Sequence, residues 1–195
     1  MIREQALKQE YVVAKKKSAK PMLWISMISM VMFFAGLTSA YVISMKRDDW
    51  VSFDLPQAFY TSTFLIVASS ITLLLSQRFL KKDKRQISLL MLVLTLVLGI
   101  GFIWQQYVGF NQLKSIGLFF TGPESTVSTS FIIGITFIHV LHLLAGVIVL
   151  LVVIYNHFKY KYKSDDMLGF ELGAIFWHFV DILWIYLFFF FSFIK

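Results

Sequence analysis

Residues 127–155 read VSTSFIIGITFIHVLHLLAGVIVLLVVIY, an apolar run without Asp, Glu, Lys or Arg. A helix rises about 1.5 Å per residue, so about 20 such residues cross the ~30 Å hydrocarbon core of a bilayer. The two histidines in this run are its most polar side chains, and it exceeds the minimum length for crossing. The run therefore predicts a helix that spans a membrane.

Four further apolar runs of comparable length occur along the chain. Charged residues make up 15% of the 195 residues, whereas a soluble domain carries about a quarter. Cysteine is absent, which excludes disulfides and thiolate metal sites. We expect an all-α membrane protein, a single domain over residues 1–195, built as a bundle of five transmembrane helices. The predicted spans cover residues 21–45, 55–77, 86–110, 127–155 and 172–194.

The Lys and Arg residues are divided unequally between the two sides of this predicted bundle. Fourteen of the 18 fall in the N-terminal segment and in the loops 78–86 and 156–171. Because basic residues accumulate on the cytoplasmic side, we expect the N-terminus in the cytoplasm and the C-terminus outside. The net charge of +7 lies in these short segments, which does not indicate a nucleic-acid partner. The first apolar run is too long for a signal peptide, so we expect its helix to be retained.

Ionisable residues inside the predicted spans are the candidate functional groups, because each is costly in lipid unless it is paired or hydrated. His139 and His142 lie three residues apart in the fourth span, and His178 and Asp181 in the fifth. Helical geometry places each pair on one face, with Glu171 nearly in line with His178. Since the two helices are consecutive and antiparallel, we expect both pairs to meet near the middle of the membrane.

Three interpretations of this intramembrane polar cluster compete. Two histidines with a further histidine and a carboxylate are suitable metal ligands. Chains of Asp and His also mark proton paths in membrane proteins. The third interpretation, which we favour, is a hydrogen-bonded cluster that holds two helices together. We therefore predict no catalytic, cofactor-binding or metal-binding residue in this chain.

Contacts between membrane helices favour small residues, because lipid gives apolar side chains no reason to leave it. Such residues recur in every predicted span, and we expect them to let helix backbones approach. Examples are Gly36 in the first span, Ser69 and Ser70 in the second, Gly99 in the third, Gly146 in the fourth and Gly173 in the fifth. We assign these positions no chemistry.

The stretch LGFELGAIFWHFVDILWIYLF, residues 168–188, resembles the terminal helix of the cytochrome c oxidase subunit III family. That family has a Gly-Phe-Glu entry followed by Trp-His-Phe-Val-Asp-x-x-Trp, and both elements are present here in register. Residues 139–146, HVLHLLAG, are similar to the family's preceding helix. Earlier spans match more weakly. The chain resembles the short, five-helix form of this family.

The resemblance implies a non-catalytic accessory subunit of a proton-pumping heme-copper terminal oxidase. Such a subunit carries no redox centre, while partner subunits hold heme and copper. It packs against catalytic subunit I, with subunit II in the same complex, holds phospholipid and supports proton uptake. We expect an aa3-type cytochrome c oxidase in a bacterial inner membrane, with a larger respiratory supercomplex as a further possible setting. Alternatives are a quinol oxidase subunit, a nitric oxide reductase-associated homologue, or a stand-alone proton or ion carrier.

Two departures from the family pattern limit what is carried over. The family often has a buried Glu in the first core helix, and Met30 stands there in this chain. A second family Glu, near the outer end of the third core helix, falls on Gly109. Roles of those two carboxylates do not transfer, whereas Glu171, His178 and Asp181 match the family's motif.

Overall fold

The computed structural model describes residues 2–48, 50–51, 54–115, 117, 126–162 and 167–194. Each helix in this part of the chain contains a window long and apolar enough to cross a membrane. The prediction of an all-α bundle with five membrane-spanning helices is thereby confirmed. The helices are α1 (Ile2–Ser44), α2 (Gln57–Lys81), α3 (Arg85–Ser115), α4 (Val127–Phe158) and α5 (Leu168–Phe193).

The helices are longer than the predicted spans, most of all α1. This helix begins at Ile2 and passes through Pro21, which we had taken as its start. A proline inside a helix removes one backbone hydrogen bond, yet α1 continues on both sides of it. At 43 residues its length is about 64 Å, roughly twice the hydrocarbon thickness. The apolar run therefore marks the part that crosses lipid, and the helix continues beyond it.

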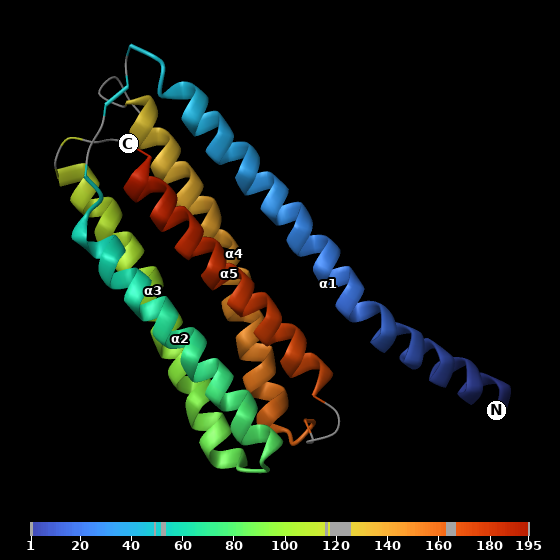
Figure 1. Ribbon diagram of the computed structural model, residues 1–195. Helices are drawn as coiled ribbons and strands as arrows, with labels where there is room; N and C mark the ends of the chain where they lie inside the picture. Colours follow the sequence, from blue (N-terminus) through green and yellow to red (C-terminus); the bar gives the residue numbers. More distant parts are fainter. Residues whose placement is uncertain are drawn as a thin grey trace.

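Figure 1 shows α2, α3, α4 and α5 as a compact group, with α1 set apart at an angle. α2 and α3 form a closely packed antiparallel pair, and α5 contacts both α2 and α4. α1 contacts α4 and α5, and within the described residues it makes no comparable contact with α2 or α3. The N-terminal part of α1 diverges from the bundle (Figure 1). α4 also contacts α3, so α4 and α5 are the two central helices, each in contact with three others.

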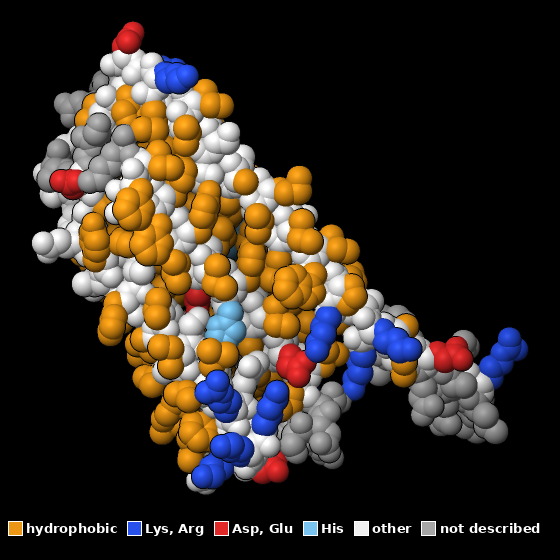
Figure 2. All heavy atoms as spheres, viewed as in Figure 1, with side chains coloured by type: hydrophobic (Ala, Val, Ile, Leu, Met, Phe, Trp, Pro, Cys, Tyr) orange, Lys and Arg blue, Asp and Glu red, His pale blue; other side chains and the backbone are white. Residues whose placement is uncertain are grey.

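The segments 78–86 and 156–162 each combine helix ends with a connection, and they lie at one end of the bundle, which we call the basic end. Figure 2 shows Lys and Arg side chains gathered there and along the N-terminal part of α1, while hydrophobic side chains cover the flank. Two residues that entered the charge count, Lys163 and Lys195, lie outside the described residues. The distribution of basic and apolar surface is that of a membrane protein seen from the side.

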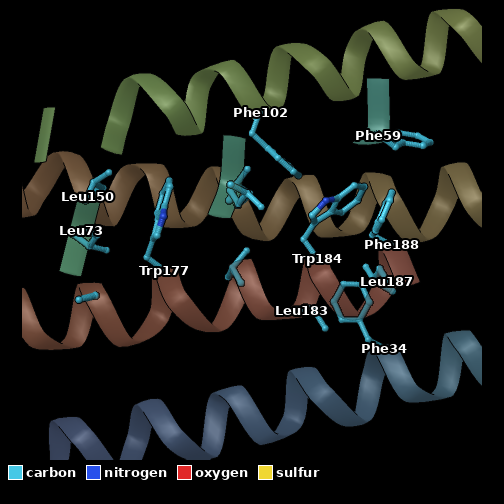
Figure 3. Packing of buried hydrophobic residues seen from close by; sticks show 14 of the residues in the cluster. Phe34, Phe59, Leu73, Phe102, Leu150, Trp177, Leu183, Trp184, Leu187 and Phe188 are labelled. Carbon is cyan, nitrogen blue, oxygen red and sulfur yellow. The ribbon is translucent and has the colours of Figure 1, made fainter. Parts of the chain in front are cut away.

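Aromatic side chains of the core pack against glycines of neighbouring helices. Trp177 of α5 is 1% exposed and points from α5 toward α4 and α3 (Figure 3). A Cβ atom added at Gly99 would lie 2.7 Å from its ring, and one added at Gly146 would lie 3.3 Å away. A Cβ atom added at Gly173 would lie 2.9 Å from Val153 of α4. Of the glycines named from the sequence, Gly36 differs, because nothing lies within 4 Å of a Cβ there.

We expect Gly99→Ala to destabilise the bundle by about 1–2 kcal/mol, because the added methyl group forces the Trp177 ring to move. Alanine has a higher helix propensity than glycine, by about 1 kcal/mol. The expected net loss therefore requires the steric clash to cost more than this gain in helix propensity. Gly36→Ala is the matched control, since its methyl group meets open space. Denaturant titration of the purified chain in detergent measures both. Equal stability of the two variants would contradict the close packing at Gly99.

Hydroxyl groups of α2 connect it to α3 along most of its length. Ser76 Oγ donates to the carbonyl of Ser88 at 2.7 Å, and the hydroxyls of Thr72 and Thr95 lie 2.8 Å apart. Nearer the other end, Gln106 Nε2 donates to Ser62 Oγ at 3.0 Å. These side chains are small or buried, so the two backbones approach closely. The α2–α3 pair is therefore held by polar contacts inside an otherwise apolar bundle.

Candidate functional site

The polar residues of the α5 motif converge on Ser70 of α2. Ser70 Oγ donates a short hydrogen bond to Asp181 Oδ2. The same oxygen lies 2.9 Å from His178 Nδ1, and with Nδ1 protonated the histidine donates to it. Asp181 is 2% exposed. The three side chains thus form a directed chain from His178 through Ser70 to Asp181.

The two tryptophans of the same motif also bond to α2. Trp177 Nε1 donates to Ser69 Oγ at 3.1 Å, and Trp184 Nε1 donates to Thr63 Oγ1 at 3.0 Å. Each of these hydroxyls donates in turn to a carbonyl of its own helix. Every polar group of Trp-His-Phe-Val-Asp-x-x-Trp that has a hydrogen-bond partner therefore finds it on one face of α2. The motif is the seam that joins α5 to α2.

Sequence reasoning did not identify Ser70 as part of the polar cluster. We had placed it among the small residues expected at helix contacts, and it lies in α2, outside the two helices that carry the ionisable residues. A hydroxyl in a membrane span is common, so its type alone gives no signal. Its spacing does, because Thr63 and Ser70 lie seven residues apart and therefore share one face of α2, with Ser69 next to Ser70.

The histidines of α4 lie in a different setting. His139 is fully buried, and neither ring nitrogen has a hydrogen-bond partner in the described part of the chain. Its ring packs 5.3 Å from Trp184 and 6.0 Å from Phe102, measured between ring centroids. His142 Nδ1 lies 2.8 Å from the carbonyl of Ile138, one turn earlier in the same helix. Aromatic packing, rather than hydrogen bonding to another helix, surrounds His139.

The structure thus divides the five candidate residues among three places. Within the described residues no hydrogen bond joins the α4 histidines to His178 or Asp181. No three His, Asp or Glu side chains of that part come close enough together to share a metal ion. The metal interpretation therefore has no geometry to support it here. What remains is the α2–α5 seam, a buried histidine among aromatic rings, and an ion pair at the membrane edge.

That ion pair joins Glu171 at the start of α5 to Lys20 of α1, with 2.6 Å between Lys20 Nζ and Glu171 Oε2. The side chains are 48% and 34% exposed. Exposed ion pairs contribute little, because water screens them and both side chains lose freedom. Its position matters more, since it ties α1 to the bundle near the point where α1 begins to diverge (Figure 1).

We expect the coupling energy of Lys20 and Glu171 to be below about 1 kcal/mol, because both groups are accessible to water. A double-mutant cycle with Lys20→Gln, Glu171→Gln and the double variant measures it by thermal unfolding in detergent. The coupling should shrink further at high salt. A coupling above about 2 kcal/mol that persists at high salt would show instead that lipid or protein shields this pair.

Met30 and Gly109 stand where the resembled family has a carboxylate, and their surroundings differ. Met30 is partly buried against the core. A Cβ atom at Gly109 would lie 2.8 Å from the ring of Phe59, so that ring occupies the place of a side chain. Phe59 is 2% exposed and packs 5.9 Å from Trp184. A glutamate at position 109 would displace a buried aromatic cluster.

Comparison with known proteins agrees with the motif. The chain matches the sequence profile of the family described as cytochrome c oxidase subunit III over residues 1–194. A cytochrome c oxidase subunit 3 from Pelomedusa subrufa is 31% identical over 127 residues, 65% of this chain and 46% of that protein. One from Pyricularia grisea is 32% identical over 136 residues, 70% and 47% of the two chains. One from Latimeria chalumnae is 25% identical over 202 residues, 96% and 74%.

The first two matches cover just under half of each relative's sequence. The chain therefore spans about half the length of these relatives. The family profile, in contrast, extends across all five helices described above. The resemblance seen in residues 139–146 and 168–188 is confirmed by this match. The chain belongs to the cytochrome c oxidase subunit III family.

Proposed function

We propose that this chain acts as accessory subunit III of an aa3-type cytochrome c oxidase in a bacterial inner membrane. The observation that carries the proposal is the family match over residues 1–194, with the α5 motif in register. The chain is then a non-catalytic part of a proton-pumping enzyme. Heme and copper belong to partner subunits, with subunit I in direct contact and subunit II in the same complex. Electrons pass through those partners to oxygen.

The proposed contribution of this chain is to stabilise the complex, hold phospholipid and support proton uptake by the catalytic subunit. The hydrogen bonds of the α5 motif support the structural part of this role, because they join its side chains to hydroxyl groups of α2. His139, His142, Glu171, His178 and Asp181 are then structural residues, with a role in lipid or proton handling as the alternative. The whole chain, residues 1–195, acts as one domain.

The outer faces of the helices supply the surface for this role. Large apolar side chains on α1 are exposed, among them Trp24 at 56% and Met32 at 70%. In a membrane, lipid tails or the helices of a partner subunit cover such a surface. Among the described residues α1 contacts only two of the four other helices, so much of its length is open to lipid tails or to the helices of a partner subunit (Figure 1). A larger respiratory supercomplex would use the same kind of surface.

Mild solubilisation of the tagged chain from its native membrane tests the proposal. A copurifying subunit with copper and heme a absorbance is the expected result. A partner with other heme types that oxidises quinol, or that reduces nitric oxide, would replace the cytochrome c oxidase assignment with the corresponding relative. A stable homo-oligomer without redox partners would overturn the accessory role and favour a stand-alone proton or ion carrier.

We also propose that the N-terminus and the basic end face the cytoplasm, from the excess of Lys and Arg on that side. Because the chain has no cysteine, single-cysteine variants report their side without background. Lys81→Cys at the basic end should resist a membrane-impermeant maleimide in intact cells, and Lys114→Cys at the other end should react. Reaction of Lys81→Cys with protection of Lys114→Cys would reverse the orientation.

A further inference from the structure

Three buried polar side chains of α3 and α4 have hydrogen-bonding atoms that lack a partner. Gln106 of α3 is 1% exposed, and Thr136 and His139 of α4 are fully buried. Gln106 Oε1, Thr136 Oγ1 and both ring nitrogens of His139 have no hydrogen-bond partner among the described residues. None of these atoms takes part in the α2–α5 seam. Because a buried polar atom without a partner is costly, atoms of this kind require an explanation.

The three side chains lie in one layer of the contact between α3 and α4. The rings of Phe102 and His139 meet across this contact, with 6.0 Å between their centroids. Gln106 lies four residues after Phe102 on the same face of α3, and Thr136 lies three residues before His139 on the same face of α4. Because the two helices are antiparallel, both steps lead toward the same end of the bundle, by about 5 Å. The unpartnered atoms of α3 and α4 are therefore neighbours.

The amide of Gln106 is held in one orientation by Ser62 of α2. Ser62 Oγ donates its only proton to the carbonyl of Phe59 at 2.9 Å, so toward Gln106 it can only accept. Gln106 Nε2 donates to it at 3.0 Å. This bond distinguishes the amide nitrogen from the amide oxygen, which would otherwise be interchangeable. Gln106 Oε1 is therefore a fixed acceptor on the other side of the amide.

Thr136 differs from the other hydroxyl residues described inside the bundle. Thr38, Ser62, Ser69 and Thr95 each donate to a carbonyl of their own helix about one turn earlier, which is the usual bond of a hydroxyl in a membrane helix. Within the described part of the chain, the hydroxyl of Thr136 makes no such bond. It is therefore free both to donate and to accept.

His139 lies among aromatic rings. Its ring centroid is 5.3 Å from that of Trp184, and Trp184 in turn lies 5.1 Å from Phe102 (Figure 3). A charged imidazolium is costly in such surroundings, so the ring is neutral. A neutral imidazole has one N–H donor and one acceptor nitrogen. His139 therefore offers one bond of each kind.

A group that satisfies these atoms must be small, uncharged, and both a donor and an acceptor. Gln106 Oε1 requires a donor, the N–H of His139 requires an acceptor, and Thr136 can bond in either direction. A water molecule has this chemistry, and a buried water typically makes about three hydrogen bonds to otherwise unpartnered groups. Immobilising a water costs less than leaving several buried polar atoms without partners.

We propose that Gln106, Thr136 and His139 bind an internal water molecule between α3 and α4. This water is a polar link between the two helices inside the membrane, where hydroxyl groups already connect α2 to α3. The site needs only residues of this chain. It is tested on the isolated chain, so it stands or falls separately from the proposed oxidase assembly.

Thr136→Val tests the site through the sign of its effect on stability. Valine has nearly the shape of threonine and lacks the hydroxyl. If Thr136 binds water, valine removes a hydrogen bond, and the folding equilibrium constant should fall about fivefold. If Thr136 is unpartnered, valine removes a buried polar group without loss, and the constant should rise. The matched control is Thr61→Val, because Thr61 is exposed on α2 and its hydroxyl bonds within its own helix. Denaturant titration in detergent measures all three proteins.

Solid-state NMR of the full-length, ¹⁵N-labelled chain in bilayers detects the water directly. Magnetisation that starts on water should reach a ring nitrogen of His139, whose signals are assigned by their loss in His139→Phe. The transfer should decrease in Thr136→Val. Exposed lysines such as Lys81 are the positive control, and Trp177 Nε1, which is buried and donates to Ser69, is the dry control. Absence of transfer to His139 in the parent, or a Thr136→Val variant more stable than the parent, overturns the proposal.

Discussion

Trp177→Ala is expected to lower the free energy of unfolding of the bundle by about 3–5 kcal/mol. The Trp177 side chain is 1% exposed and fills the space between Gly99 of α3 and Gly146 of α4. Removal leaves a cavity bordered by glycines, which have no side chains to move into it. The variant also leaves Ser69 Oγ without its donor from α5. Loss of packing and loss of a buried bond act in the same direction.

The matched control for this prediction is Trp104→Ala. Trp104 lies on α3 and is 65% exposed, so its removal creates no cavity inside the chain. Unfolding by a denaturing detergent, followed by tryptophan fluorescence and circular dichroism, compares the two variants. Trp177→Ala should unfold at a much lower detergent fraction, with Trp104→Ala near the parent. If both variants lose the same stability, the core of the isolated chain is not packed around Trp177.

The spans were predictable because lipid imposes a simple length rule on apolar runs. The same rule says nothing about helix that continues into water. The segment of α1 before Pro21 is charged, carries no apolar run, and is nevertheless helical in the structure. The sequence therefore located the crossing of the membrane and missed the length of the first helix.

The candidate site was predictable in its residues and not in its partners. Ionisable side chains in a membrane span are rare enough to be noticed one by one, which identified His178 and Asp181. Their partner, Ser70, is an ordinary hydroxyl on a helix more than 100 positions away in the chain. Which helices adjoin depends on the packing of the whole bundle, and the spacing within one helix does not contain that information. Gly36 illustrates the same limit, because its type predicted a close contact that the structure does not show.

The exchange of Asp181 distinguishes a structural role of the seam from a role in proton transfer. Asp181→Ala removes the acceptor for Ser70 Oγ and leaves a buried gap, so we expect a loss of about 2–3 kcal/mol and a clear drop in assembled complex. Asp181→Asn keeps an oxygen acceptor of the same shape while it removes the group that exchanges a proton. Structural use of Asp181 therefore predicts near-normal assembly for Asp181→Asn and poor assembly for Asp181→Ala. Asp48→Ala, at an exposed carboxyl between α1 and α2, is the control.

Turnover and proton uptake of the complex that does assemble complete this test. With a structural seam, turnover per assembled complex stays near that of the parent in both variants, because the loss lies in the amount of complex. Ser70→Ala should reproduce the assembly defect of Asp181→Ala, since it removes the same hydrogen bond from the α2 side. Normal assembly of Asp181→Asn together with slowed proton uptake would reverse the assignment. Asp181 would then be a proton-carrying group that Ser70 and His178 hold in place, and the seam would be part of a proton path.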